Sequence, residues 1–459
     1  MLSWLSNGMR LAILVVVVSC SGAPPHPANC PATITAAIVK AYPTATPGAC
    51  KLEHEDGVDQ YEVAISMGDG RRGEAEVSVA GVLTALELTI DAAALPDAVK
   101  HALAAKYPNA TPTKVERVER PGKPLQFEIA IAGTEVTLSD NGEAETAFTT
   151  HAIALPGATA DGIAMDYIAY DPRTKAVWVP AGNTGSVDVI DAATGKVSRI
   201  DGFPTQVMER RGRKRTVGPS SVTLGDAGTV YVGNRGDFTV CAIDERTLAK
   251  GRCVKLDAMP DAIAFVAPTH ELWITTPRDN SIRIVSTATL AQTARLPFDG
   301  EPEGAAIDAA HNRFYTNLED KDLTLGIDLT SHKTESTWKA SCGEDGPHGL
   351  RVVDNESRLL VACSAQVHSV DVAHDGAITS SLEVGDGVDD LDYDPQTRTV
   401  YAAGGKPGQL AVVSLGSDGK LAARGSTPTG EGARNAVAGD GKIYVTHSKG
   451  SEIIVVAPK

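Results

Sequence analysis

The chain lacks several features that commonly reveal a function. Its seven cysteines include no Cys-x-x-Cys pair, which argues against a zinc ribbon or a thioredoxin-type site. No Gly-x-x-x-x-Gly-Lys-Ser/Thr motif occurs, so the sequence offers no P-loop for nucleotide phosphates. Basic residues are fewer than acidic ones, 42 against 58, and the net charge of -16 disfavours nucleic acid as a partner. The 459 residues are enough for two or three domains.

The N-terminal apolar run is also short. Leu11–Val18 follows Arg10 and has the length of a signal-peptide core, whereas a membrane-spanning helix needs about 20 residues. The run ends in "VVSC", which resembles a bacterial lipobox, and this resemblance implies a lipid on Cys20 and, because Ser21 follows, an outer-membrane anchor. The alternative is an ordinary cleaved signal with an incidental cysteine. We therefore predict a signal peptide over 1–20 and a Pro-rich tether over 21–29.

Six cysteines remain when Cys20 is set aside. An even number suits disulfide bonding in an oxidising compartment, although six cysteines allow about 15 connectivities. We predict the pairing of sequence neighbours, which gives Cys30 with Cys50, Cys241 with Cys253, and Cys342 with Cys363.

Residues 30–148 contain two similar stretches, "KAYPTATP" at 40–47 and "AKYPNATP" at 105–112. Each ends an alanine-rich, helix-like run, and segments of alternating polarity follow it. The pattern predicts a small α+β domain of two helix-strand-strand repeats. It resembles PepSY-like modules, some of which bind or inhibit peptidases. A packing or spacer domain is the alternative.

From residue 149 to 459 the sequence changes to short β-rich runs with a period of about 40 residues. Seven units each carry an apolar first strand, a second strand such as "TVYVGN", and one or two further strands. The arithmetic predicts a seven-bladed β-propeller, so the chain as a whole should be mainly β. The seventh unit runs out of chain, and "FTTHAIAL" at 148–155 is expected to supply its missing strand and close the ring.

Three of the second strands carry a family resemblance. "YVGN" at 231–234, "YTN" at 315–317 and "YVTH" at 444–447 are similar to the YVTN repeats of YncE-like propellers. The resemblance implies the propeller fold and often a periplasmic location. The biochemical roles of such propellers vary, so the fold carries little function with it.

One position in every unit, just ahead of the first strand, should face the centre of the propeller. Four of the seven residues at this position are acids, and ionisable side chains that converge in a concavity are the usual sign of a site. These residues, which we call the ring, are Asp166, Ser220, Asp261, Glu303, His348, Asp389 and Arg434.

One interpretation of the ring needs no function: the centre of a propeller is a water-filled channel, and polar residues at its mouth can simply be solvated or paired, as Arg434 with a neighbouring acid. Beyond that interpretation, the ring allows two kinds of function. In the first, it forms a polar funnel that binds a small ligand or a protein, and no cofactor is needed. In the second, Asp261, Glu303, His348 and Asp389, with Asp166 as a fifth ligand, hold Ca²⁺, Mn²⁺ or Zn²⁺, and a metal-bound water attacks the substrate. Propellers that resemble regucalcin and gluconolactonase use a metal in this way to hydrolyse lactones. We favour binding, with a metal-dependent hydrolase or lyase as the alternative.

The segment "ERRGRKR" at 209–215 has five basic residues in seven on an otherwise acidic chain. Such a cluster can contact anionic lipid headgroups or lipopolysaccharide, or simply be a solvated loop. Taken together, the sequence predicts a bacterial cell-envelope lipoprotein, anchored to the outer membrane by its N-terminal lipid, with an envelope protein or a small molecule as partner.

Metal content separates the two functions of the ring. For the binding interpretation, we expect a soluble chain that starts after Cys20 to contain no stoichiometric metal and to keep its melting temperature after chelation. About one metal per chain, lost in His348→Ala and Glu303→Ala, would instead establish the metal-dependent alternative.

Overall fold

The computed structural model describes residues 30–458 except 56–57, 109, 122–123, 133, 143–147 and 211. The predicted signal peptide, Cys20 and the tether lie outside these described residues. By its internal contacts the chain divides into two compact units, one of residues up to Leu95 with Thr111–Glu135, the other of Pro96–Ala110 with Val136–Lys459. Within the described part, no helix has the length and apolar character that a membrane crossing requires.

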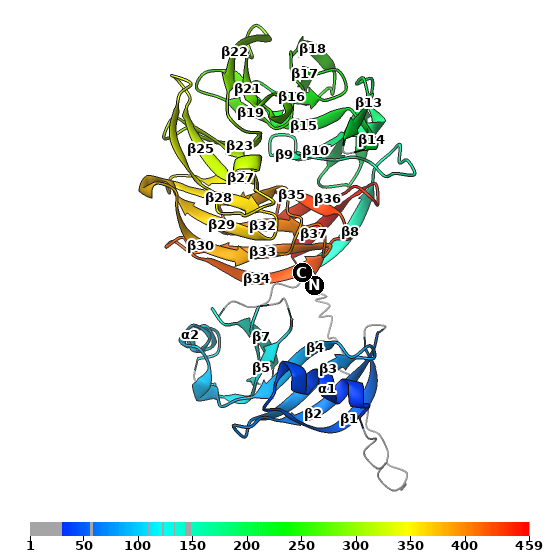
Figure 1. Cartoon of the computed structure of the whole chain (residues 1–459), viewed down its shortest axis with the longest axis vertical. Helices are drawn as coiled ribbons and strands as arrows, with labels where there is room; N and C mark the ends of the chain where they lie inside the picture. The colour runs from blue at the N-terminus through cyan, green and yellow to red at the C-terminus, as the bar shows by residue number, and fades with distance from the viewer. Residues whose placement is uncertain are drawn as a thin grey trace, which may run out of the picture. The chain divides into compact units, whose positions relative to one another are not determined.

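In the described residues before the propeller, the elements are two α-helices, a short 3-10 helix at Ala92–Ala94 and seven strands (Figure 1). Strands β1 to β7 form one sheet in sequence order. Helix α1 places Ile34 and Ile38 on one side, where they are buried with Val63, Val77 and Leu86 of the sheet. The bounds are α1 Ala32–Ala41, β1 Thr46–Glu55, β2 Val58–Ser66, β3 Arg72–Ser78, β4 Leu83–Thr89, α2 Asp97–Lys106, β5 Pro112–Glu119, β6 Gln126–Ile131 and β7 Thr134–Ser139.

The predicted helix-strand-strand repeat is wrong in its strand count. Four strands follow α1 and three follow α2, where two were expected after each helix. Three strands, β1, β4 and β5, were missed. In β1 and β5 the polar and charged residues show little alternation with apolar ones. In β5 the two buried residues, Val115 and Val118, are three positions apart, and the strand contains a register shift between Pro112 and Lys114.

The seven-bladed β-propeller is confirmed. Seven four-stranded antiparallel sheets follow one another around it (Figure 1). The first six blades are β9 Ala169–Asp171, β10 Ala176–Ala181, β11 Ser186–Asp191 and β12 Val197–Ile200; β15 Pro219–Leu224, β16 Thr229–Asn234, β17 Thr239–Asp244 and β18 Lys250–Lys255; β19 Ile263–Val266, β20 Glu271–Thr276, β21 Ser281–Ser286 and β22 Ala291–Pro297; β23 Pro302–Asp308, β24 Arg313–Leu318, β25 Leu323–Asp328 and β26 Thr334–Lys339; β27 Pro347–Val353, β28 Arg358–Cys363, β29 Gln366–Asp371 and β30 Ala377–Glu383; and β31 Leu391–Asp394, β32 Thr399–Gly404, β33 Gln409–Leu415 and β34 Leu421–Pro428.

The seventh blade combines both ends of the propeller sequence. It consists of β35 Ala433–Gly439, β36 Lys442–His447, β37 Glu452–Pro458 and β8 Phe148–Ala154. Strand β8 pairs antiparallel with β37, with Ile153 opposite Ile453. The predicted closure by residues 148–155 is therefore confirmed. The pairing covers the outer edge of β37, which would otherwise be an open strand edge.

Neighbouring blades are held together by buried apolar layers. The second strand of the first blade, β10, is buried along its whole length. Between the third and fourth blades, Trp273 packs on Phe314 with ring centroids 4.9 Å apart and against the edge of His332 at 5.2 Å. These layers fix the angle between blades and so determine where the first strand of each blade ends.

All three predicted disulfides are confirmed. Cys241 and Cys253 lie opposite each other in β17 and β18, and Cys342 joins the segment before β27 to Cys363 of β28. In the first unit, Cys30 joins the start of α1 to Cys50 of β1.

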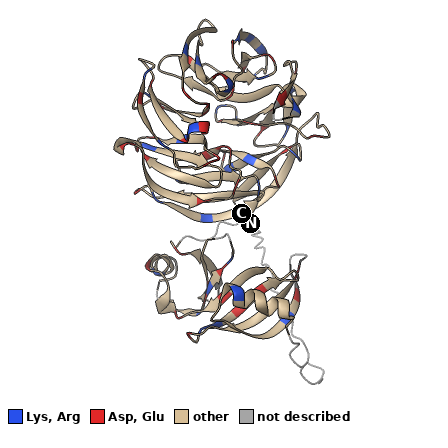
Figure 2. Cartoon of the chain, in the orientation of Figure 1, with Lys and Arg blue, Asp and Glu red and all other residues tan. Residues whose placement is uncertain are grey.

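The first and second blades are separated by an extra hairpin. Its strands, β13 Gln206–Arg210 and β14 Arg213–Val217, pair antiparallel with Glu209 opposite Lys214. The hairpin contains most of the basic segment, and it explains why Asp166 and Ser220 are further apart in sequence than other ring neighbours. The rest of the molecule carries charges of both signs on its strands and turns (Figure 2).

Candidate functional site

The ring occupies the innermost strands of the propeller. The first strand of each blade contacts that of the next, and β35 contacts β9. Backbone hydrogen bonds join neighbouring blades at the ring: the N–H of Tyr167, which follows Asp166, donates to Ser220 O at 3.1 Å, and Asp389 N–H donates to Arg434 O at 3.2 Å. The prediction that every ring residue precedes its strand is wrong for four of them, because β15, β23, β27 and β35 each begin one residue before the ring residue.

Arg235 joins two of the ring acids. Its guanidinium lies 2.9 Å from Asp166 and also donates to Asp261, so one cation links the first, second and third blades. Asn435, which is 1% exposed, donates to Asp389 at 3.1 Å and to Asp166 at 3.5 Å. The amide therefore joins the sixth blade to the first.

Arg434 and His348 complete this side of the ring. The Arg434 guanidinium lies 3.4 Å from Asp389, and its side chain is 45% exposed. His348 is half-buried, and its backbone carbonyl accepts a hydrogen bond of 2.5 Å from the side-chain amide of Asn317. Ser220 is 4% exposed, and its hydroxyl has no hydrogen-bond partner among the described residues.

Glu303 is held from the opposite side of the propeller. The phenol of Tyr167, in the first blade, donates a 2.6 Å hydrogen bond to Glu303 in the fourth. The first and fourth of seven blades are nearly opposite, so this hydrogen bond crosses the centre. Thr316 supports the Glu303 backbone by donating to its carbonyl at 3.2 Å.

Burial and neighbouring charges raise the pKa values of two ring acids and lower the pKa of a third. Burial, with the negative charges of Asp389 and Asp166, raises the pKa of Glu303 to about 8 even though the Tyr167 hydrogen bond opposes the shift. Burial also raises the pKa of Asp166, against the influence of Arg235. For Asp389 burial acts in the same direction, but Arg434, His348 and Asn435 outweigh it and lower the pKa. At neutral pH the ring thus holds a protonated Glu303 near an ionised Asp389.

One cavity is lined by three of the ring residues. It has a volume of about 710 Å³, and we call it the upper chamber. Hairpin β13–β14, the loop before β9, and residues of the second and seventh blades line it. The lining residues used below are Ala164, Asp166, Lys214, Arg215, Ser220, Arg235 and Arg434.

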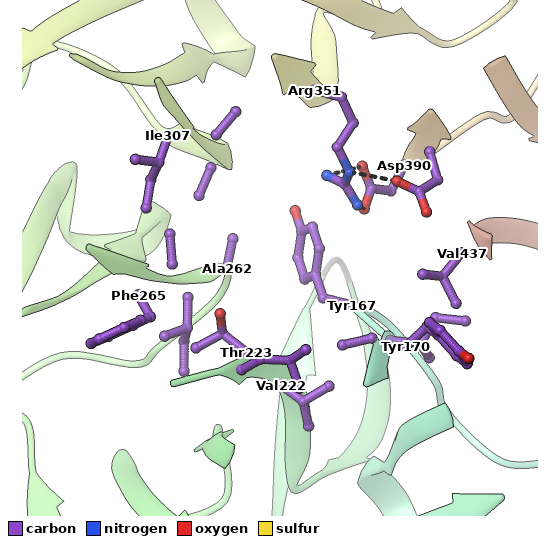
Figure 3. Close-up of a pocket in the computed structure, with 18 of the residues that line it drawn as sticks. Tyr167, Tyr170, Val222, Thr223, Ala262, Phe265, Ile307, Arg351, Asp390 and Val437 are labelled. Atoms are coloured by element: carbon purple, nitrogen blue, oxygen red, sulfur yellow. Dashed lines mark hydrogen bonds and ion pairs between the residues drawn. The ribbon is translucent and has the colours of Figure 1, made fainter. Parts of the chain in front are cut away.

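Another cavity, the lower chamber, has a volume of about 460 Å³. Tyr167 projects into its centre, and Val222, Phe265 and Ile307 form much of its wall (Figure 3). Arg351 supplies the polar side through a 3.0 Å ion pair with Asp390, whose pKa burial raises to about 6. The two chambers therefore differ in chemistry: cations gather in the lining of the upper chamber, whereas the lower chamber combines an apolar wall with Arg351 and several aspartates.

The ring acids are already engaged by protein groups. Asp166 and Asp261 contact Arg235, Asp389 contacts Arg434, and Glu303 accepts from Tyr167. Two groups of three potential metal ligands have donor atoms within 4.8 Å of one another in the described residues, and neither belongs to the ring. One is Glu87, Glu116 and Glu128; the other is Cys342, Cys363 and His368, in which both sulfurs form a disulfide.

Several central residues were absent from the sequence prediction. Tyr167 and Asn435 each follow a ring residue directly, so a wider window around each ring position would have included them. Arg235 follows the "YVGN" segment and lies directly after the last residue of β16, the strand that follows β15 in the second blade. Its place at the centre depends on the return of β16 alongside β15, which the repeat alone does not indicate.

Comparisons with known proteins identify the fold. No protein-family profile and no curated protein matches the chain. Among solved structures, a chain of a mitotic checkpoint complex aligns with a TM-score of 0.55 and 16% identity, covering 69% of this chain and 92% of its own. Virginiamycin B lyase from Staphylococcus aureus aligns with a TM-score of 0.54 and 12% identity, covering 68% of this chain and 100% of its own. The chain shares a propeller fold with both. At these identities the likeness extends to the fold alone.

The raised pKa of Glu303 predicts a pH dependence of stability. An acid with a folded-state pKa of about 8 binds a proton in the folded state that the unfolded chain, with a pKa of 4.5, has released. The contribution of Glu303 to the free energy of unfolding therefore decreases as the pH rises from about 4.5 to about 8, by at most about 1.4 kcal/mol per pH unit. We expect Glu303→Gln to lose less stability than the wild type between pH 6 and pH 9, measured by urea unfolding.

Tyr167→Phe is the matched control. It removes the hydrogen bond that opposes the raised pKa but leaves the carboxyl group in place. The pH dependence should persist in Tyr167→Phe and move to higher pH. Equal slopes in the wild type and in Glu303→Gln would show that Glu303 ionises normally.

Proposed function

We propose that the chain is a cell-envelope lipoprotein whose propeller binds a small ligand in the upper chamber, against the ring. The observation that carries the proposal is the chamber itself, about 710 Å³ in volume and lined by ring residues of three blades. Ligand sites typically enclose about 300–1,000 Å³ and combine such a volume with a few fixed polar groups.

The ring suits orientation of a ligand. Asp166 and Arg235 are fixed by their mutual ion pair, and Arg434 remains partly exposed while it contacts Asp389. Groups that are held in place before binding lose little conformational freedom when a ligand arrives. A protein partner remains compatible with the fold, since one matched propeller belongs to a multiprotein complex. Such a partner would be expected to contact the rim rather than enter the chamber.

The metal-dependent hydrolase or lyase stays the alternative. Its ligand set of Asp261, Glu303, His348 and Asp389, with Asp166, would have to exchange contacts with Arg235, Arg434 and Tyr167 for contacts with a cation. Arg235 is partly buried, so removing its two acidic partners would cost free energy, which is why we rank binding first. The metal measurement described above decides between them.

The envelope location rests on the sequence, with support from the disulfides. Three disulfides suit an oxidising compartment, in agreement with the signal-like N-terminus and the lipobox resemblance at Cys20. In this proposal residues 30–148 are the PepSY-like α+β domain and residues 149–459 the YncE-like propeller.

A bulky side chain in the upper chamber tests ligand binding. Ala164 lines the chamber and is exposed, so Ala164→Trp should fill space without removing a charge. We expect compounds that raise the melting temperature of the wild type, in a panel of neutral, cationic and anionic metabolites, to lose this effect in Ala164→Trp.

Ala309→Trp is the matched control, because Ala309 is an exposed residue in the turn after β23 and does not line either chamber. It should keep the response of the wild type. A panel without any stabilising compound, or stabilisation that is equal in Ala164→Trp, would contradict binding in the upper chamber.

The lipid anchor has a separate test. Expressed in a bacterial host with its own N-terminus, the wild-type chain should incorporate labelled palmitate and partition with membranes. Cys20→Ala should lose both properties, because the thiol that carries the lipid is absent. Cys20→Ala that remains labelled would refute the anchor, while the ligand tests on the soluble chain would be unaffected.

A further inference from the structure

We propose that the ligand of the upper chamber is a small anion carrying at least two negative charges, as phosphate or carboxylate groups, held between hairpin β13–β14 and Arg434. This inference rests on the proposed function and specifies the chemical class of its ligand. It also gives a role to the basic segment of the sequence, which the ring does not use.

The hairpin brings cations to the chamber. Lys214 and Arg215 lie on β14, both are exposed, and both line the chamber. Neither forms an ion pair with another residue of the described chain. An exposed basic pair on a chain of net charge -16 would be expected to find acidic neighbours. Here both residues line the cavity, and Glu209 lies opposite Lys214 in the hairpin without forming a hydrogen bond or ion pair with it in the part of the chain that the structure describes.

Arg434 adds a third accessible cation from the opposite end of the propeller sequence. Its side chain is 45% exposed and has one ion pair, at 3.4 Å, with Asp389. The acids that line the chamber neutralise only part of this positive charge. Asp166 is 13% exposed at its side chain and already paired with Arg235, which leaves Asp161 as the exposed carboxylate. Accessible cations thus exceed accessible acids in the chamber by three to one.

Two buried donors in the same lining need acceptors. The hydroxyl of Ser220 and the Nε–H of Arg235 are both buried and have no hydrogen-bond acceptor among the described residues. A buried donor without an acceptor costs about 1–3 kcal/mol. Both residues line the chamber, and the oxygens of a phosphate or carboxylate would supply the acceptors that these donors lack. Hydrogen bonds to a charged acceptor are roughly twice as strong as neutral ones.

The charge of the whole chain does not prevent this binding. At physiological salt the Debye length is about 8 Å, so distant acids are largely screened while groups in contact with the ligand are not. A divalent anion that contacts three cations should therefore bind, and its affinity should fall as salt increases.

Calorimetric titration of the soluble chain with inorganic phosphate and with tricarballylate tests the proposal. We expect at least one of these probes to bind. Lys214→Gln/Arg215→Gln should weaken its binding about tenfold or more, and Arg434→Gln should do the same, because each removes charge-assisted contacts. Ser220→Ala should weaken it by a smaller factor.

The double variant Lys333→Gln/Lys339→Gln removes the same charge from exposed positions in and near β26, away from both chambers. It should bind the probe within about twofold of the wild type, since exposed charges beyond a Debye length are largely screened. Because the hairpin lies outside the blades, its variant tests the proposal even where Arg434→Gln fails to fold.

The outcomes separate this inference from the proposed function. Neutral or cationic compounds whose binding Ala164→Trp abolishes, with no binding of either anion, would overturn the anionic class and leave ligand binding intact. Equal losses in the hairpin variant and in the Lys333/Lys339 control would also overturn it. Vesicles containing anionic lipid form a further arm: if the hairpin variant loses vesicle binding and neither soluble probe binds, the basic segment contacts a membrane surface and the chamber proposal is wrong.

Discussion

The structure depends on closure of the seven-bladed ring. Strand β8 enters the last blade from the beginning of the propeller sequence and pairs with β37, so the first and seventh blades cannot separate without breaking this pairing. Closure fixes the diameter of the centre, because seven blades of similar size pack through continuous apolar layers. With that diameter fixed, Tyr167 can reach Glu303 in the fourth blade, and the hairpin after the first blade lies beside Arg434 of the last.

The centre of the propeller brings charged groups close together at reduced exposure. Four ring acids would repel one another strongly if all were ionised and unpaired. Arg235, Arg434 and Asn435 offset part of this repulsion, and a raised pKa at Glu303 removes another part by keeping that acid protonated. Such a network contributes little net stability after desolvation. The network instead holds its side chains in fixed positions. Arg434 is partly exposed and lines the upper chamber, while the ring acids are paired with other groups.

Much of the fold could be predicted because the sequence repeats. The period of about 40 residues identified seven blades, and the shortfall at the C-terminus identified the closing strand. The ring positions followed from the repeat as well. Tyr167, Arg235 and Asn435 were missed, since each becomes central only through contacts between blades. Strands β1 and β5 were missed for a different reason, namely that polar strands show no clear period.

The sequence by itself determined the number of blades, the disulfide partners and the seven positions at the starts of the innermost strands, because these depend on local periodicity and on spacing along the chain. It left open what the ring acids do. The tertiary structure decided that each acid meets an arginine, an amide or a phenol from another blade, and that a basic hairpin lines a chamber with Arg434. Those outcomes depend on distances between segments far apart in sequence, which are set by how the blades pack and close.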